Sequence, residues 1–445
     1  MTQKQQLKRL LGKSFSIVVC VGLIVGLGIM RTPGEIAEIV SDPWIYMSLW
    51  IGGGLFVLLS VLTVAELFAI TPRTGGTYVL VRHAYGPYPG FVVGWADWIS
   101  YCGSIALKSV VVVEYMALLM PEITPFIKPL AVLTSTVFAA LQLVGIRLAA
   151  SIQHAAVFGI GLIMLSITVA LFYGYFTAGT AVTDAVAAVA PTRLTQYGIV
   201  VTAVVYTYDG WFAATIFGGE LKGGGRSTAI GSIKAILIVI SIYVLLNLAL
   251  VLAVPLTALV GNDLALSGAI EIVFGNGTGT LIIFAAIFIL LAHHNNQYMM
   301  APRIFYALSA DGLGTERAAQ FSEKGTPVPA LFFSWIAMIS LIMVGGFNFL
   351  LSLTAFLFVL IYISVVIGVF RLRRKEPNIE RPYRAWGFPY VGIVCIIGWV
   401  SLAVFIAYSN PVSVAYALGL LAISVPAYLW IKRSNNPRGA VSSES

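Results

Sequence analysis

The segment GLIVGLGIM, residues 22–30, places three glycines inside the first long apolar stretch of the chain. A later apolar stretch carries YTYDGW at residues 206–211, where Asp209 and Gly210 interrupt it. An unwound turn in a membrane-spanning helix leaves backbone N–H and C=O groups unpaired, and hydrocarbon penalises each of them heavily. Such a turn must face a ligand or a wet cavity. The two segments therefore predict discontinuous helices that meet at a binding site.

Close packing is the alternative explanation for these glycines. Gly22 and Gly26 stand four residues apart, which is the spacing of small residues at contacts between membrane helices. The two interrupted stretches lie five spans apart, at matching places in two halves of the chain. This match favours unwinding over packing.

The composition is that of a membrane protein. Hydrophobic residues make up 59% of the 445 positions and charged residues only 10%, which a globule with a wetted surface cannot accommodate. A spanning helix needs roughly 20 apolar residues. We therefore expect an all-α integral membrane fold with about 12 transmembrane helices. The expected spans are Ser14–Val40, Trp44–Ile70, Pro87–Met120, Pro125–Val144, Ala149–Tyr175, Tyr197–Gly219, Ser227–Val254, Gly279–Ser309, Val328–Val344, Phe347–Phe370, Val391–Ser409 and Ser413–Ile431.

Basic residues gather in alternate connections between these spans, which the positive-inside rule assigns to the cytoplasm. Acids or few charges occupy the other connections. We expect a multi-pass protein of the cell inner (plasma) membrane with both termini cytoplasmic. The net charge of +8 is then a topology signal and does not predict nucleic-acid binding. The basic residues are Lys4, Lys8, Arg9 and Lys13; Arg73 and Arg82; Arg147; Lys222 and Arg226; Arg303, Arg317 and Lys324; Arg371, Arg373, Arg374 and Lys375; and Lys432, Arg433 and Arg438.

The matched breaks divide the chain into two halves. The first apolar run lacks an A-x-A cleavage site and should remain as a helix rather than be removed as a signal peptide. We expect a five-plus-five inverted repeat with discontinuous helices 1 and 6. Its parts are a cytoplasmic N-terminal segment at 1–13, a first repeat at 14–175 with helices 1–5, a second repeat at 197–372 with helices 6–10, helices 11–12 at 388–433, and a cytoplasmic tail at 434–445.

Recognisable motifs lie within these spans and at their ends. The segment 22–30 is followed by Thr32-Pro33, and the sixth span carries Tyr206–Trp211 with Glu220 nine places after the tryptophan. The others are Ala65-Glu66-Leu67, Pro72, Gly75-Gly76-Thr77-Tyr78, Tyr85-Gly86-Pro87, Asn295, Arg303, Asp311-Gly312, Thr326-Pro327 and Arg381-Pro382-Tyr383.

From about Ser14 to about Pro382 these motifs resemble the amino acid–polyamine–organocation (APC) superfamily, and within it bacterial relatives of the L-type amino acid transporters. Leucine at position 27 and methionine at position 30 stand where the family has serine and phenylalanine. The resemblance implies alternating access, with the substrate held between spans one, three, six, eight and ten.

The resemblance also implies a substrate site at the breaks. Past the turn at Gly26, the amides of Leu27 and Gly28 would hold the substrate carboxylate, without the hydroxyl that the family serine adds. Ser104 and Gln297 would line the pocket, and Tyr206 occupies the position of the gating aromatic. The carbonyls expected to hold the substrate ammonium are those of Ile24, Tyr206, Thr207 and Asp209.

Several charges inside the spans leave alternatives open, since such charges are expensive and usually functional. Asp209 either caps amides of the unwound turn or acts on substrate or proton. Lys108, about one turn from Ser104, either pairs with an acid such as Asp209 or Glu66 or lines the cavity as a cation.

The polar run at residues 293–297 cannot face lipid. His293 and His294 lie about 100° apart on a helix, so they cannot both face the substrate. Hydrogen-bonded packing is the expected role of these histidines, and proton movement is the alternative.

Charges near the cytoplasmic ends of spans two, six and eight are coupling or gating candidates. Glu66, Glu220 and Arg303 either form ion pairs that close an inner gate or are solvated boundary charges. Sodium coupling is disfavoured. Gln153 leads to Ile160 where many family members have a lysine, and Ala301-Pro302 offers no side-chain oxygen where a sodium site would need hydroxyls.

The function we expect is secondary active transport of amino acids, by exchange (as an antiporter) or by proton-linked uptake. Transport of amines or polyamines, with Asp209 as counter-ion, is the alternative, as is a non-transporting amino acid sensor. No catalytic set, metal-ligand spacing or phosphate loop predicts an enzyme, a metal site or a cofactor. Cys20, Cys102 and Cys395 all fall within spans and form no disulfide framework. The expected partners are a small amino acid substrate and the lipid bilayer, with a homo-oligomer or an accessory subunit left open.

Overall fold

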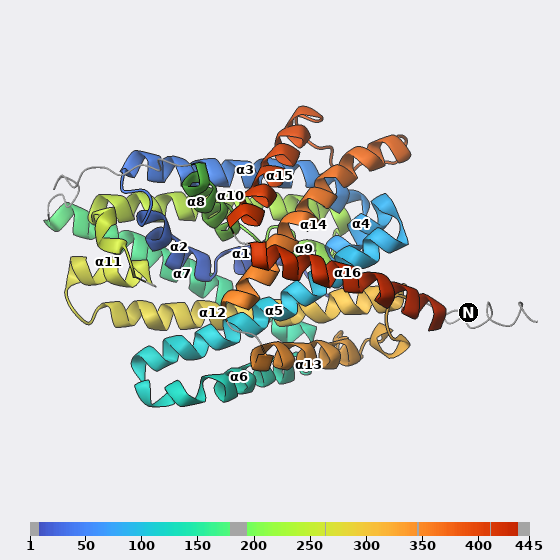
Figure 1. Ribbon diagram of the computed structural model, residues 1–445, viewed down its shortest axis with the longest axis horizontal. Coiled ribbons are helices and arrows are strands. Elements are labelled where there is room, and N and C mark those ends of the chain that lie inside the picture. Colours follow the sequence, from blue (N-terminus) through green and yellow to red (C-terminus); the bar gives the residue numbers. More distant parts are fainter. Residues whose placement is uncertain (1–8, 179–193, 263, 345–346, 410, 435–445) are drawn as a thin grey trace, which may run out of the picture.

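The computed structural model describes residues 9–178, 194–262, 264–344, 347–409 and 411–434, and these residues are helical apart from turns and two isolated β-bridges (Figure 1). Most of the predicted N-terminal segment and the predicted tail lie outside the described residues. The all-α class is confirmed. In chain order the helices are α1 (Phe15–Ile24), α2 (Leu27–Ala37), α3 (Pro43–Ile70), α4 (Thr77–Tyr85), α5 (Pro87–Leu119), η1 (Pro121–Phe126), α6 (Ile127–Gln142), α7 (Ile146–Ala178), α8 (Leu194–Thr207), α9 (Ala213–Ile216), α10 (Gly224–Ala253), η3 (Leu256–Leu259), α11 (Ala265–Phe274), α12 (Gly279–Ala310), η4 (Glu316–Ala319), α13 (Val328–Val344), α14 (Phe347–Lys375), α15 (Tyr390–Ser409) and α16 (Pro411–Ser434).

Within the described residues, 10 stretches are long and apolar enough to cross a membrane. The spans expected at Tyr197–Gly219 and Val328–Val344 contain shorter apolar helices, because the first is interrupted and the second has only 17 residues. The number of spans and the inverted repeat therefore stay predictions.

One short helix, α4, lies in a connection between two of the expected spans. Positive-φ glycines bound α4, Gly76 before it and Gly86 after it, and Pro87 then opens α5. Glycine adopts such backbone angles without a steric penalty. The motifs at residues 75–78 and 85–87 are thus the start and the end of a separate helix.

The broken first span lies at the centre of the molecule. In its most apolar stretch of 18 residues, 76% of the residues are buried. The corresponding share is 11% in Pro121–Gln142 and in Val414–Arg433, which present apolar side chains outward. In Figure 1, α3 and α10 pack along each other on one side, α5 and α12 cross the middle, and α6 packs on α13 at the opposite edge. An interrupted helix in this central place is shielded from lipid, as its unpaired backbone groups require.

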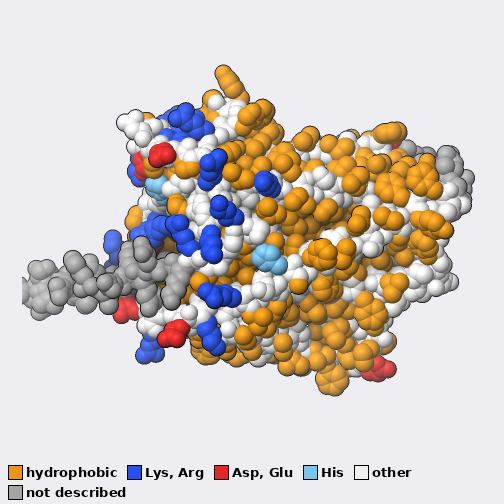
Figure 2. Space-filling view, turned by 180° about the vertical axis from the view of Figure 1, so that it is seen from behind, with side chains coloured by type: hydrophobic (Ala, Val, Ile, Leu, Met, Phe, Trp, Pro, Cys, Tyr) orange, Lys and Arg blue, Asp and Glu red, His pale blue; other side chains and the backbone are white. Residues whose placement is uncertain are grey.

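Lysine and arginine side chains gather at one end of the molecule, and apolar side chains cover the visible flank beyond them (Figure 2). The last turns of α14 and α16 lie at this end, with Arg373, Arg374 and Lys375 on the first helix and Lys432 and Arg433 on the second. We call it the basic end.

Candidate functional site

The first predicted break is present between α1 and α2. Val25 has an extended backbone with ψ 94°, and Gly26 is the N-cap residue of α2 with φ −139° and ψ −147°. No side chain caps this helix start. The first amides of a helix have no partner within it, so the α2 N-terminus presents open N–H groups at the break.

The second predicted break separates α8 from α9. The chain leaves α8 at Thr207, and α9 begins at Ala213 after a turn in which the Asp209 amide donates to the Tyr206 carbonyl at 3.0 Å. Gly210 has φ +118°, in the region that favours glycine. The YTYDGW motif therefore encodes this turn.

The two breaks touch each other. A Cβ atom on Gly210 would lie 2.9 Å from Leu23 Cγ and 3.1 Å from the Ile24 nitrogen, and one on Gly28 would lie 3.0 Å from Thr207 Oγ1. Only glycine allows so close an approach of one backbone to the other. The backbones of both breaks are thus brought to one place in the buried centre.

The predicted carbonyl ligands are partly engaged by the protein itself. Tyr243 of α10 donates its hydroxyl to the Ile24 carbonyl at 3.0 Å, and the Tyr206 carbonyl accepts the Asp209 amide. Each carbonyl keeps a second lone pair. Tyr206 is 36% exposed, whereas Thr207 is buried. Sequence reasoning missed Tyr243, because nothing distinguishes it from other aromatic residues in apolar spans.

A polar cluster joins α5 to α12 beside the first break. Lys108 Nζ lies 2.8 Å from Ser104 Oγ, 3.1 Å from His293 Nε2 and 3.2 Å from Gln297 Oε1, and Gln297 Nε2 donates to Ser104 Oγ at 3.1 Å. Each helix contributes two residues four positions apart, which share a face. Ser104 and Gln297, both predicted to line the pocket, are thus in contact.

Lys108 does not form the expected ion pair. Its contacts are all neutral, and no carboxylate oxygen among the described residues lies within 4.0 Å of it. Glu66 binds two arginines at the basic end, and Asp209 accepts a hydrogen bond from Tyr362 of α14. Lys108 and Asp209 both keep some accessible surface in this buried region. The expected ion pair is therefore not formed among the described residues, and the role of a cavity-lining cation stays a prediction.

The remaining polar residues of the 293–297 run bond to three different helices, as the expectation of hydrogen-bonded packing requires. They are His294, whose Nε2 lies 2.8 Å from Ser109 Oγ of α5; Asn295, which donates to Gln153 of α7 at 2.9 Å; and Asn296, which donates to the Val19 carbonyl of α1 at 2.8 Å.

Of the two alternatives for Glu220 and Arg303, an ion pair or solvated charges, the structure shows the ion pair. The guanidinium binds the carboxylate in a bidentate manner, with distances of 2.7 Å and 3.0 Å, and both side chains are 3% exposed. Leu11 of the N-terminal segment pairs with the same loop through backbone hydrogen bonds to Glu220 and Lys222. The N-terminal segment, the loop after α9 and α12 therefore contact one another at this point.

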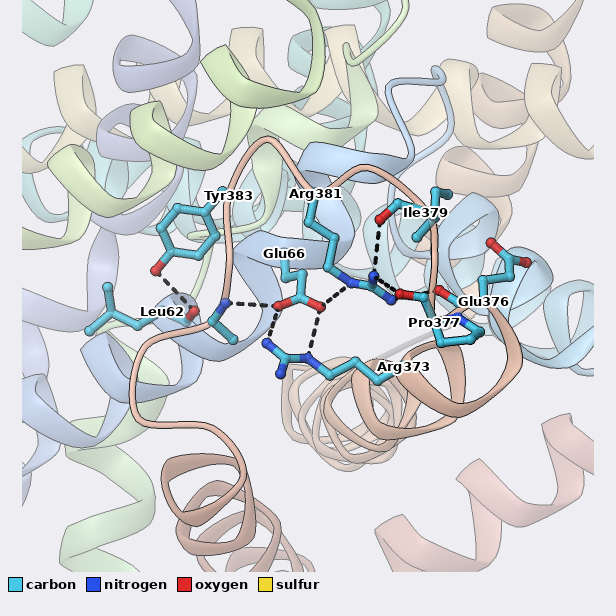
Figure 3. A network of polar contacts seen from close by, with 9 residues as sticks. Leu62, Glu66, Arg373, Glu376, Pro377, Ile379, Arg381 and Tyr383 are labelled. Atoms are coloured by element: carbon cyan, nitrogen blue, oxygen red, sulfur yellow. Dashed lines mark hydrogen bonds and ion pairs between the residues drawn. The ribbon is translucent and has the colours of Figure 1, made fainter.

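Glu66 has partners of its own. Its carboxylate binds Arg373 at the end of α14, Arg381 in the following loop, and the amide of Ala385 (Figure 3). The expected gate charges thus separate into two groups, one around Glu220 and one that fixes the α14–α15 link against α3.

Asp311 organises a third cluster at the basic end. It accepts hydrogen bonds from Arg73 at 3.0 Å and from the Tyr78 hydroxyl at 3.0 Å, and it pairs with Arg82. Burial raises the pKa of Tyr78 to about 12, so this hydroxyl keeps its proton and remains a donor. This cluster fastens α4 to the end of α12.

Sequence reasoning also missed Asp97 of α5. Its side chain is buried, one oxygen accepts a hydrogen bond from Thr77 of α4, and the other has no partner among the described residues. The signal was available, since an acid within an apolar span is a candidate functional residue.

Comparison with known proteins assigns the family. The family model described as amino acid permease matches residues 13–429. The chain belongs to the amino acid permease family. The match supports amino acid transport and a multi-pass membrane protein, and it agrees with the APC-type motifs of the sequence.

Three relatives of this permease cover nearly all of it. The serine/threonine exchanger SteT of Bacillus subtilis (strain 168) is 25% identical over 97% of this chain and 99% of its own. The human large neutral amino acids transporter small subunit 2 is 26% identical over 95% and 80%. The human cystine/glutamate transporter is 25% identical over 98% and 88%. Every one of these names denotes carriage of amino acids.

Proposed function

We propose that this permease is a secondary active transporter of amino acids that works by alternating access. The observation that carries the proposal is the contact between the two helix breaks at Gly210 and Leu23-Ile24. Residues 14–175 and 197–372 act as the two repeats, and the substrate binds where their broken helices meet.

The chemistry of the breaks suits a zwitterion. The start of α2 offers open amides and the positive end of a helix dipole to a carboxylate. Carbonyls of the α8–α9 turn and the carboxylate of Asp209 offer acceptors to an ammonium group. Backbone groups recognise the part that all amino acids share, and the Ser104–Gln297 side of the pocket meets the part that differs.

Exchange is the transport mode that we favour. SteT is named an exchanger, and the other two relatives are named transporters. Sodium coupling is disfavoured because Ala301 and Pro302 carry no side-chain oxygen. The basic end faces the cytoplasm, with both termini on that side, and the Glu220–Arg303 pair closes the path there.

A counterflow experiment tests the proposal. The purified chain is reconstituted alone into sodium-free liposomes loaded with a mixture of unlabelled common amino acids, and each labelled amino acid is added outside in turn. We expect accumulation of at least one of them, and far less in liposomes without internal amino acids. Accumulation that external amines abolish and amino acids do not would favour the amine alternative. Binding without accumulation would favour a sensor, and either result contradicts the proposal.

A further inference from the structure

His293 stands between Lys108 and the first helix break. Its side chain is 5% exposed, and its Nε2 lies 3.1 Å from Lys108 Nζ. The other ring nitrogen, Nδ1, has no hydrogen-bond partner among the described residues. A Cβ atom on Gly26 would lie 2.7 Å from this Nδ1. The ring therefore aims its unpaired nitrogen at the break.

Lys108 fixes which nitrogen of His293 carries the proton. An ammonium group has three N–H donors and no acceptor. Its three contacts are Ser104 Oγ, Gln297 Oε1 and His293 Nε2, so each of them accepts when Lys108 is in its ammonium form. With Nε2 accepting, the proton of the neutral ring is on Nδ1. The side chain consequently presents a buried N–H donor without an acceptor, which is costly unless a ligand supplies one.

The start of α2 adds further N–H donors beside this one. Gly26 is the N-cap of α2, and no side chain caps the amides that follow. An imidazole N–H and open amides at the same break, next to a lysine without a contact carboxylate, attract an anion and repel an ammonium group.

We propose that the Nδ1–H of His293 donates a hydrogen bond to the carboxylate of the transported amino acid, with Lys108 as the positioning residue that sets its tautomer. This inference rests on the proposed function. Position 27 carries a leucine, so it offers no side-chain hydroxyl to the carboxylate. The inference assigns a side-chain donor to α12 instead. The substrates are then amino acids with a free carboxylate, and their esters, amides and parent amines are excluded.

Two variants of His293 separate the donor from the ring's other contact. His293→Gln reaches the Nε2 position and keeps an acceptor for Lys108, but it loses the Nδ1–H donor. His293→Asn keeps an N–H close to the Nδ1 position. The probe is the amino acid with the fastest counterflow. Hydrogen bonds to charged groups predict that KM rises about ten- to hundredfold in His293→Gln. We expect His293→Asn to recover most of that loss, and the control His154→Gln, on an exposed residue of α7, to match the parent.

Nitrogen-15 NMR of histidine-labelled protein in liposomes gives an answer even if a variant fails to fold. We expect the His293 signal of the unmodified chain to report the Nδ1–H tautomer and to shift when the probe amino acid is added, but not with its methyl ester. In Lys108→Met the ring should become a mixture of tautomers, while Lys108→Arg restores the single form.

The outcomes that overturn the inference are distinct from those that overturn the proposed function. An Nε2–H tautomer, or counterflow by His293→Gln with the parental KM, rejects the role of His293 and leaves transport intact. Absence of counterflow for every amino acid in the unmodified chain rejects the proposed function, and this inference falls with it.

Discussion

Single glycines set how closely the broken helices approach each other. Gly210 allows the α8–α9 turn to reach the backbone of Leu23 and Ile24, and Gly28 faces Thr207 at a distance that barely admits a Cβ atom. A larger side chain at either position would push apart the groups that we assign to substrate binding.

Gly28→Val tests this at the scale of one residue. A Cβ at position 28 already lies 3.0 Å from Thr207 Oγ1 and 3.3 Å from its Cα, and the two further methyl groups of valine would need still more room. We expect counterflow to fall below detection, because the α2 amides no longer reach the substrate. Counterflow in proteoliposomes measures it.

The matched control is Gly52→Ala on α3, where a Cβ would meet nothing within 4 Å. It should transport like the parent, since a surface change from glycine to alanine in a helix costs nothing in packing. If Gly28→Val transports as fast as the unmodified chain, the proposal that the α2 amides bind the substrate is rejected.

Sequence reasoning succeeded at residue level where the signal was local. Glycines and Asp209 within apolar runs predicted both breaks, and Arg303 and Glu220 stood out as charges at span ends. The partner of Lys108 could not be predicted, because the choice among Asp209, Glu66 and neutral acceptors depends on which helix lies opposite. His293 was left between packing and proton movement, since its tautomer follows from that same contact.

At the scale of elements, the buried ion pair joins the link after α9 to α12. Arg303 and Glu220 satisfy each other, and Arg303 also donates to the Gly325 carbonyl at 3.0 Å. Removing one partner of a buried pair typically costs about 3–5 kcal/mol, because the other charge is left unpaired. The packing of the link after α9 on α12 should therefore depend on both residues.

Arg303→Met is expected to lower the thermal unfolding midpoint of the detergent-solubilised protein, since it strands Glu220 in a buried site. The double variant Glu220→Gln/Arg303→Met should recover a large part of that loss, because no buried charge remains. A double variant as unstable as the single one would show that the arginine acts by its packing and its contact with Gly325 instead. Arg31 and Glu35 form an exposed pair on α2, and Glu35→Gln, the control, should change the midpoint little.

The sequence predicted spans alone, and no helix was expected in the connections between them. Composition and length located the long apolar helices, but α4 and α11 are short amphipathic helices whose limits are set by turns and by packing on neighbours. Their formation depends on tertiary contacts, which a single sequence does not contain.

For the whole molecule, the apolar surface and the position of the basic side chains both indicate a protein that spans a membrane. Apolar side chains cover the outer helices, and basic side chains collect at one end (Figure 2). Three polar clusters, around Glu66, Asp311 and Glu220, fasten that end (Figure 3 for the first). Under the proposed function, this arrangement corresponds to a transporter that is closed at its basic end, with its site at the centre.

The most direct measurement of the central claim is an electron cryomicroscopy structure of the reconstituted chain with an amino acid that undergoes counterflow. We predict density between the two breaks, with the carboxylate at the α2 amides and His293 Nδ1 and the ammonium group at the carbonyls of the α8–α9 turn. A ligand bound elsewhere, or two continuous helices through Gly26 and Gly210, would contradict the account.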